Sequence, residues 1–425
     1  MIRSRSTSGT PAFPSQTPGE SLGDPGLRAS TAPPRPEFSE PTLDARPAAC
    51  RASRLSLTLL VLMLGLIAAG MGCARIGTPE GWSGGVVQDE TLYIGTAEGE
   101  LLALDAVSGE TLWKFVLLGE EDERAIYAPT AVTEDALFVG GYDGRLYVLS
   151  LEGDLLWQGS LGGEVVGGPT VVGDLVLVSD SSGALTAFDI EERLPEWLLL
   201  SRWIFSTGDK VWSSPAVAEG VVYIGSLDHN VYAVNLSNGS EVWRFPTGGG
   251  VTASPLVVKG RVYVGAFDGV FYALDAATGA EVWRFDGADS WYWTHAIADN
   301  DTLYAPSLDG NLYALELTTG RLKWTMETEG PIVGSPVIVF DMIAVPSADG
   351  KLWIANLRDG TSVNVCNVGE EIRTTLVERD GVVYFGARDR SIRAISITSA
   401  GQRSEKWVYF TDRDDPLPMN RAVDC

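Results

Sequence analysis

The chain has few of the residues from which many enzyme sites are built. It holds two histidines, four cysteines and six methionines among 425 residues. His229 and His295 lie far apart, and the cysteines at 50, 73, 366 and 425 are never adjacent. The sequence has no H-E-x-x-H motif and no glycine-rich loop ending in Gly-Lys-Ser or Gly-Lys-Thr. These absences argue against a zinc hydrolase and a P-loop nucleotidase, and no metal site is expected.

Positive charge is also scarce. Lysine and arginine number 31 against 56 aspartates and glutamates, which gives a formal net charge of −25. A surface this acidic repels nucleic-acid phosphates and anionic lipids, so we expect no nucleic-acid partner. The excess of carboxylates either serves solubility or steers basic segments of a partner, and the sequence leaves both interpretations open.

Only one long apolar run occurs, from Leu55 to Ala69. It follows Arg51 and Arg54 and leads into Gly-Met-Gly-Cys at 70–73. Residues 51–73 therefore read either as a signal peptide whose lipobox-like end makes Cys73 a lipidated N-terminus, or as an uncleaved membrane anchor. Both interpretations tether the rest of the chain to a membrane, outside the cytoplasm. Residues 1–50, rich in proline and serine, are predicted to be a disordered leader.

A repeat about 40 residues long is abundant instead. Aligned copies include VYIGSLDHNVYAVNLSNGSEVWRF at 222–245 and VYVGAFDGVFYALDAATGAEVWRF at 262–285. Eight small or turn residues mark the copies: Gly95, Gly140, Ser179, Gly225, Gly265, Pro306, Pro346 and Gly386. Each copy reads as four short strands joined by turns, with Asp-Gly in several second turns. The period predicts an all-β fold, an eight-bladed β-propeller of four-stranded antiparallel blades over 82–410, followed by a tail at 411–425.

A tryptophan recurs in the fourth strand of most copies. In five copies it stands eight residues after the acidic or amide residue that opens the last turn. A large ring at a fixed place in every outer strand suits packing between neighbouring blades, so these residues are interpreted as structural. They are Trp113, Trp157, Trp197, Trp243, Trp283, Trp324 and Trp407.

The pattern YVG-x-x-DG-x-x-YALDA-x-TG-x-x-VW resembles the repeat of pyrroloquinoline-quinone-type propellers. That resemblance covers nearly all of 82–410 and implies either a quinoprotein dehydrogenase or a non-enzymatic relative of the BamB type. The dehydrogenases carry an adjacent Cys-Cys pair over the cofactor, a calcium site and longer loops. This chain has no adjacent cysteines and little sequence beyond eight minimal blades. The resemblance therefore implies the BamB-like branch, with no quinone cofactor and no catalytic residue.

One set of residues is a candidate binding site. Thirteen residues before each marker stand Trp82, Tyr127, Val166, Trp212, Thr252, Trp293, Val333 and Arg373. These positions begin the innermost strands and should surround one mouth of the central channel, with Trp291 and Tyr292 beside them. The acidic run Glu120, Glu121, Asp122 and Glu123 should lie on the same face. The rings either plug the channel or dock a partner by aromatic contact and acidic steering.

These observations together predict a monomeric, membrane-tethered binding scaffold outside the cytoplasm, acting like BamB in the assembly of outer-membrane proteins. Its partners would be other envelope proteins. The alternatives are a reduced quinoprotein dehydrogenase and a ligand-binding sensor ectodomain with a cytoplasmic leader. Cys366 is predicted to be a buried free thiol, in preference to a disulfide with Cys425.

Overall fold

The computed structural model describes residues 83–119, 124–193, 196–412 and 416–417. All regular secondary structure in these ranges is β-strand. Within the same ranges, no helix is long and apolar enough to cross a membrane.

The strands form eight antiparallel sheets that follow one another along the chain. The first four blades comprise β1 (Val86–Gln88), β2 (Thr91–Gly95), β3 (Glu100–Asp105) and β4 (Thr111–Val116); β5 (Ala131–Val132), β6 (Leu137–Gly140), β7 (Arg145–Leu149) and β8 (Leu155–Ser160); β9 (Thr170–Val172), β10 (Leu175–Ser179), β11 (Ala184–Arg193) and β12 (Glu196–Ser206); and β13 (Ala216–Ala218), β14 (Val221–Ser226), β15 (Asn230–Asn235) and β16 (Glu241–Pro246).

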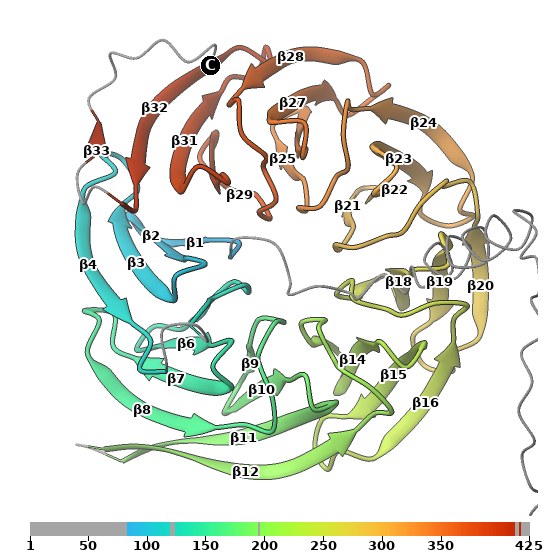
Figure 1. The fold of residues 1–425 in the computed structure, drawn as a ribbon. Coiled ribbons are helices and arrows are strands. Elements are labelled where there is room, and N and C mark those ends of the chain that lie inside the picture. The colour runs from blue at the N-terminus through green and yellow to red at the C-terminus, as the bar shows by residue number, and fades with distance from the viewer. Residues whose placement is uncertain (1–82, 120–123, 194–195, 413–415, 418–425) are drawn as a thin grey trace, which may run out of the picture. The chain divides into compact units, whose positions relative to one another are not determined.

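The last four blades comprise β17 (Leu256–Val258), β18 (Arg261–Gly265), β19 (Phe271–Asp275) and β20 (Glu281–Phe285); β21 (Ile297–Asp299), β22 (Thr302–Pro306), β23 (Asn311–Glu316) and β24 (Leu322–Glu327); β25 (Val337–Val339), β26 (Met342–Pro346), β27 (Lys351–Asn356) and β28 (Ser362–Asn367); and β29 (Val377–Arg379), β30 (Val382–Gly386), β31 (Ser391–Ile397), β32 (Arg403–Phe410) and β33 (Pro416–Leu417). Figure 1 shows the blades arranged in a ring, which confirms the predicted eight-bladed propeller.

The two middle strands of each blade are buried on both faces. In β14 and β15 every residue is buried except at the strand ends. The sequence of these two strands does not alternate strictly between polar and apolar residues. A sheet with only one covered face would show that alternation. Neighbouring blades cover both faces, so the core consists of eight apolar layers between blades and one of them joins blade 8 to blade 1.

Blade 8 closes the ring through contacts with the first blade. The Tyr384 hydroxyl and the Trp407 indole both donate to the carbonyl of Ala106, at 3.1 and 3.0 Å. Each blade is built from consecutive strands, so closure depends on packing, these two bonds and the ion pair between Arg390 and Glu98 at 3.0 Å. The short β33 adds a fifth strand to blade 8, pairing antiparallel with the outer edge of β32.

Tryptophans of the fourth strands clamp adjacent blades together. The Trp243 indole donates to the carbonyl of Ala276 in the last turn of the next blade, at 2.9 Å. The same turn passes so close that a Cβ added to Gly279 would lie 2.6 Å from the Trp243 ring. Equivalent bonds are made by Trp113, Trp203, Trp283, Trp324 and Trp407.

The prediction that Trp197 belongs to this series is wrong. Trp197 pairs with Glu192 near the end of the long β11–β12 hairpin, whereas Trp203 lies opposite Ala187, as Trp243 lies opposite Ala233. The β11–β12 hairpin makes the repeat of blade 3 six residues longer than that of blade 4. The tryptophan that contacts the next blade therefore stands six residues later in the sequence than the repeat would place it. Counted back from the next marker, Trp203 stands 22 residues before Gly225 and Trp243 stands 22 before Gly265. That count could have identified it.

The Asp-Gly turns act as predicted, as tight hairpins. Gly269 has a φ of 76°, and the Asp268 carboxylate accepts bonds from the Tyr272 hydroxyl at 2.5 Å and the Gly248 N–H at 2.7 Å. Gly248 lies in the loop from the preceding blade. The Asp268 carboxylate thus connects a turn, a strand and a neighbouring loop. Its oxygens accept hydrogen bonds from groups of the protein itself.

Cys366 is buried in β28 and takes part in a disulfide. The predicted free thiol is therefore wrong. The sequence pattern could not decide this, because an apolar strand position suits a buried thiol and a disulfide equally. The cysteines at 50, 73 and 425 lie outside the described residues.

Candidate functional site

The loops that enter the innermost strands each carry a buried anchor followed by a residue directed to the ring axis. The anchor packs against the marker glycine of the preceding blade: a Cβ on Gly225 would lie 2.3 Å from Val251, and one on Gly265 would lie 2.2 Å from Tyr292. The marker is small because the next loop crosses directly over it. This repeated crossing holds the residue after each anchor at the mouth of the channel.

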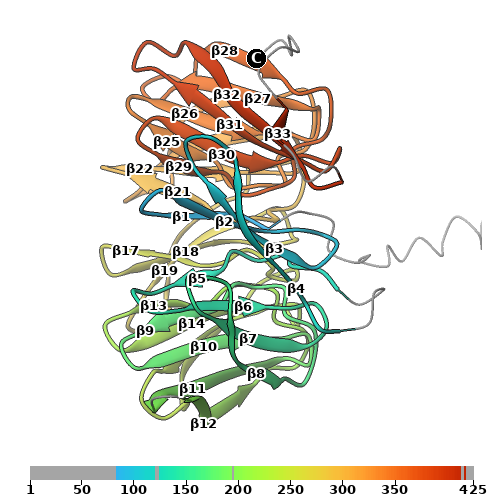
Figure 2. The same cartoon turned by 90° about the vertical axis from the view of Figure 1, so that its left-hand side faces the viewer.

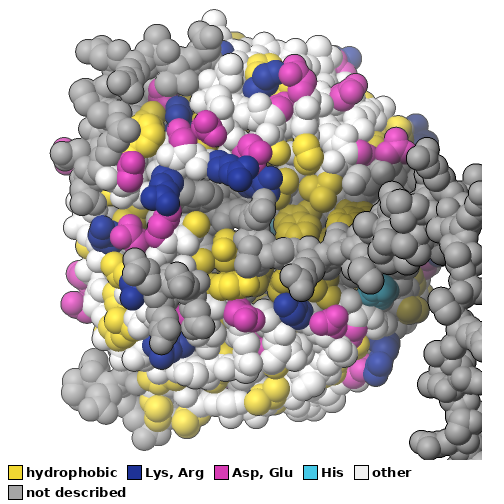
Figure 3. All heavy atoms as spheres, viewed as in Figure 1, with side chains coloured by type: hydrophobic (Ala, Val, Ile, Leu, Met, Phe, Trp, Pro, Cys, Tyr) yellow, Lys and Arg dark blue, Asp and Glu magenta, His cyan; other side chains and the backbone are white. Residues whose placement is uncertain are grey.

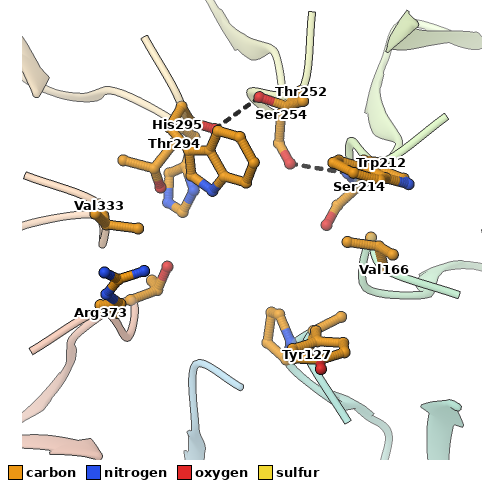
Figure 4. Close-up of a pocket in the computed structure, with 15 residues that line it drawn as sticks. Tyr127, Val166, Trp212, Ser214, Thr252, Ser254, Thr294, His295, Val333 and Arg373 are labelled. Atoms are coloured by element: carbon orange, nitrogen blue, oxygen red, sulfur yellow. Dashed lines mark hydrogen bonds between the residues drawn. The ribbon is translucent and has the colours of Figure 1, made fainter. Parts of the chain in front are cut away.

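Seven of the residues counted back from the markers line a single hollow of about 140 Å³. Figure 4 shows the labelled side chains around its open centre, contributed by successive blades. The seven are Tyr127, Val166, Trp212, Thr252, Trp293, Val333 and Arg373. The eighth position, Trp82, lies outside the described residues, as does the acidic run 120–123.

Two rings that line this pocket, Trp212 and Trp293, belong to a cluster of four aromatic side chains that continues beyond the lining. Phe267 stacks between Trp291 and Trp293, with ring centroids 4.7 and 5.6 Å apart. Trp212 meets Trp293 edge-on at 6.1 Å, and Lys210 lies 5.6 Å from the Trp212 ring. Figure 3 shows hydrophobic side chains gathered around the central hollow, with charged side chains farther out. We call this set the aromatic wall: Trp212, Phe267, Trp291 and Trp293.

Sequence reasoning missed Phe267 because it lies in a hairpin turn two residues after the marker Gly265, outside the positions that were aligned. Its N–H donates to the carbonyl of Gly250 at 2.9 Å, and the same bond recurs between Tyr142 and Ala125 and between Leu308 and Trp291. Extending the repeat alignment by two residues would have found this second ring of positions.

Tyr292, which was predicted to belong to the rim, is fully buried. It is the anchor residue of its loop, and its ring contacts Phe271 edge-on at 5.2 Å. Burial raises the pKa of the Tyr292 hydroxyl, which has no hydrogen-bond partner. The loop between β20 and β21 explains the correction, because it buries Tyr292 as its anchor and leaves the neighbouring Trp291 exposed.

Among the described residues, the pocket lining contains one charged side chain, Arg373, and no aspartate or glutamate. Glu371 lies just outside it and bonds Arg373 at 2.7 Å and Arg388 at 3.1 Å. The pocket is therefore apolar with a basic edge, although the whole chain is acidic. The prediction of acidic steering rests on residues 120–123 alone.

His295 borders the pocket, but hydrogen bonds with a buried serine fix its position. Its Nδ1 lies 2.9 Å from the Ser335 hydroxyl, which also donates to the His295 carbonyl at 3.0 Å. Desolvation lowers the pKa of His295 to about 4, so the ring is neutral near pH 7. Ser335 is fully buried, so this serine and histidine cannot serve as a nucleophile and base for a substrate.

The pocket does not fit a calcium-assisted quinone. Calcium takes six to eight oxygen ligands, commonly including carboxylates, and no carboxylate occurs among the described residues that line the hollow. Its volume of about 140 Å³ suits a single ring or side chain. What the geometry can do is accept one apolar or aromatic group between tryptophans, with polar contacts from hydroxyls and an arginine around it.

Known proteins resemble this chain in sequence. The profile of the family described as outer membrane protein assembly factor BamB matches residues 98–203, 200–290 and 268–363. The Shewanella oneidensis BamB protein is 33% identical over 150 residues, which cover 32% of this chain and 37% of that protein. The Nitrosomonas eutropha protein of the same name is 26% identical over 193 residues, 44% of each chain. The matches thus span less than half the length of these relatives.

Solved structures with similar folds include BamB from Moraxella catarrhalis, with a TM-score of 0.60 at 18% identity. The alignment covers 77% of this chain and 96% of that structure. A computationally designed protein, Ika8, aligns with a TM-score of 0.60 at 17% identity, over 79% of this chain and 98% of its own. At these identities the likeness concerns the fold alone.

Proposed function

The chain belongs to the family of the outer membrane protein assembly factor BamB, and from that premise we propose that it is a membrane-tethered scaffold for assembling outer-membrane proteins. It works outside the cytoplasm, by binding other envelope proteins rather than by catalysis. The observation that carries the proposal is the aromatic wall of the central pocket.

An aromatic wall of this kind suits protein docking. Aromatic side chains concentrate binding energy at protein interfaces because they bury large areas with little loss of side-chain freedom. Trp291 is 38% exposed and stands at the outer end of the stack. The opposite ends of the blades carry short turns such as 275–279, whose Asp275 side chain bonds its own turn. The pocket face therefore offers more side-chain area to a partner than the turn face.

Site-specific photocrosslinking in cells tests this proposal. A photoreactive amino acid at Val333, in the pocket, should crosslink to envelope proteins, whereas one at Ala277, in a turn of the opposite face, should not. Trp293→Ala should abolish the crosslink from Val333 while the protein stays folded. Equal crosslinking from both positions, or an unchanged yield in Trp293→Ala, would show that this face is not the docking site.

The acidic run is a separate part of the proposal. Glu121→Lys with Glu123→Lys should slow partner capture in proportion to the effect of added salt on the wild type, if these residues steer a basic partner. If the charge variants fail and Trp293→Ala does not, the aromatic wall is a plug and steering carries the binding.

The non-enzymatic role has its own test. The purified protein is titrated with pyrroloquinoline quinone and calcium, and alcohols are assayed with a dye acceptor. We expect neither tight binding nor dye reduction. Stoichiometric binding with turnover would make the chain a quinoprotein dehydrogenase.

The tether is proposed to be lipid on Cys73. Mass spectrometry of protein extracted from membranes should then find a mature chain that begins at Cys73 and carries acyl groups. Peptides from 1–50 still joined to the propeller would favour the anchor helix instead, and both results are compatible with a membrane-tethered scaffold.

A further inference from the structure

The outer strand of blade 3 differs from the outer strands of the other blades. β12 has eleven residues, whereas β16 has six and β20 has five. Every blade has a register shift between its third and fourth strands, and in blade 4 the pairing ends at Glu241, just beyond that shift. In blade 3 the pairing continues beyond the shift, from Phe188 with Ser201 to Arg193 with Glu196. The result is a second regular stretch of six residue pairs beyond the shift, against three in blade 8 and one in blade 4.

Two side chains on the outward row of β12 are exposed and apolar, with Arg202 between them. Leu200 is 45% exposed and Ile204 is 62% exposed, while Leu199 and Trp203 face the core. Ile204 lies opposite Thr186 in the register position where blade 4 has Arg244 opposite Tyr232. Blade 4 thus carries a charge at a place where blade 3 carries an exposed β-branched residue.

Charges on an edge strand protect it from pairing with other strands. Arg244 bonds Glu241 at 2.8 Å and lies over the Tyr232 ring at 5.6 Å, and Arg284 repeats this arrangement in blade 5. An incoming strand would have to desolvate those ion pairs. From residue 198 to residue 206 of β12 only Arg202 is charged, and it is bonded to Asp189 and Asp174.

Among the described strands, none pairs with the outer edge of β12. It ends the sheet order β12-β11-β10-β9, and Figures 1 and 2 both show it outermost in its blade. Such an edge presents a row of backbone N–H and C=O groups without strand partners.

Blade 8 shows that this propeller accepts an added strand at an outer edge. β33 pairs antiparallel with β32, with Val408 opposite Leu417 and Tyr409 opposite Pro416. Blade 8 therefore has five strands, and the fifth comes from an extended segment that is not part of the repeat.

We propose that the free edge of β12 binds an extended polypeptide segment by antiparallel strand addition. The backbone of the segment pairs with β12, and its alternate apolar side chains lie beside Leu200 and Ile204 on the outward face. This site lies on the rim of blade 3, away from the pocket, and does not depend on the proposed docking face.

A second copy of this chain is a poorer occupant on grounds of area. The nine described residues from 198 to 206 make an edge roughly 30 Å long at about 3.4 Å per residue, and a sheet is roughly 10 Å thick. Pairing therefore buries roughly 300 Å² on each partner, or about 600 Å² in all, against the 1,200–2,000 Å² of a stable interface. Such an area suits transient binding of an extended segment.

Fluorescence anisotropy with a defined peptide tests the proposal. The probe is a labelled nine-residue peptide that alternates valine with threonine and has blocked ends, added to the full mature chain. We expect saturable binding that Leu200→Lys with Ile204→Lys weakens at least tenfold. The matched control is Val242→Lys, at an exposed valine of β16, which should leave the affinity unchanged.

A second probe separates backbone pairing from simple hydrophobic contact. The same peptide, N-methylated at every second residue, should bind in one methylation register and fail in the other, because only alternate N–H groups face β12. Equal binding in both registers, or equal affinity of wild type and the Leu200/Ile204 variant, would overturn strand addition. So would a concentration-dependent dimer that the same variant abolishes, since β12 would then be a self-association edge. None of these outcomes bears on crosslinking from the pocket.

Discussion

Blades 3 and 4 use the same joint to the next blade but have different outer edges. Trp203 and Trp243 donate to equivalent carbonyls of the following blade, Leu236 and Ala276, each at 2.9 Å. The outer hairpin of blade 4 then ends in a tight turn, whereas that of blade 3 runs on as a long ribbon. The comparison teaches that ring closure constrains the tryptophan joint, while the end of the outer hairpin is free to lengthen and acquire another role.

The largest effect should come from removing the joint. Trp203→Ala and Trp243→Ala should each lower the free energy of unfolding by about 3–5 kcal/mol, because a buried ring is lost and a cavity remains. Trp197→Ala, outside the joint, should cost far less. Denaturant unfolding of the three variants measures this, and an equal cost for Trp197→Ala would place the joint of blade 3 elsewhere.

The second-largest loss of stability should come from changing the glycine that packs against each of these tryptophan rings. Gly279→Ala should cost about 2–4 kcal/mol, since its φ is 71° and an added Cβ would lie 2.6 Å from the Trp243 ring. Gly260→Ala is the matched control, with the same φ of 71° and no neighbour within 4 Å. It should cost only about 1–2 kcal/mol. The two values would agree if the ring contact contributed nothing.

A smaller, pH-dependent effect distinguishes the turn aspartates of the two blades. Burial alone would raise the pKa of Asp228, but hydrogen bonds from the Tyr232 hydroxyl and the Gly208 N–H outweigh it and hold that pKa below its usual value. Since the folded pKa lies below the unfolded one, the stabilisation is complete above about pH 4 and is lost as the pH falls through the folded value.

Asp228→Asn should therefore cost about 1–2 kcal/mol near pH 7, and the stabilities of variant and wild type should converge in acid. Asp180 in blade 3 has Ala184 where blade 4 has Tyr232, so Asp180→Asn tests the same turn without the tyrosine. Thermal unfolding from pH 7 to pH 3 makes the comparison. A constant difference across that range would show that the charge of Asp228 is not what the variant loses.

The smallest change in stability should come from substitutions on the outer edge strands of the two blades. Arg244→Ala should not shift the denaturation midpoint of the protein measurably, because its ion pair with Glu241 is exposed. Ile204→Arg, which gives blade 3 the residue of blade 4, should also leave stability unchanged. If Ile204→Arg destabilised the fold, the apolar row of β12 would be part of the core and not a binding edge.

Several features of the site followed from counting along the repeat. The residue thirteen positions before each marker lies at the pocket in all seven described cases, and where the marker is Gly95, Gly140, Gly225 or Gly265 the next loop crosses directly over it. Phe267 and Tyr292 did not follow from the count. The stacking of Phe267 on Trp291 joins two blades, and the burial of Tyr292 depends on the loop that it anchors.

The amino-acid sequence by itself determined the number of blades, the turns between strands and the seven described residues that the count places at the channel mouth. These depend on short-range alternation and on a period that every blade repeats. Only the tertiary structure decided which tryptophan of blade 3 forms the joint, that Cys366 is in a disulfide, and that β12 leaves an apolar edge open. The physical reason is that these properties arise between segments whose contacts exist only after the ring has closed, as when Tyr384 meets Ala106.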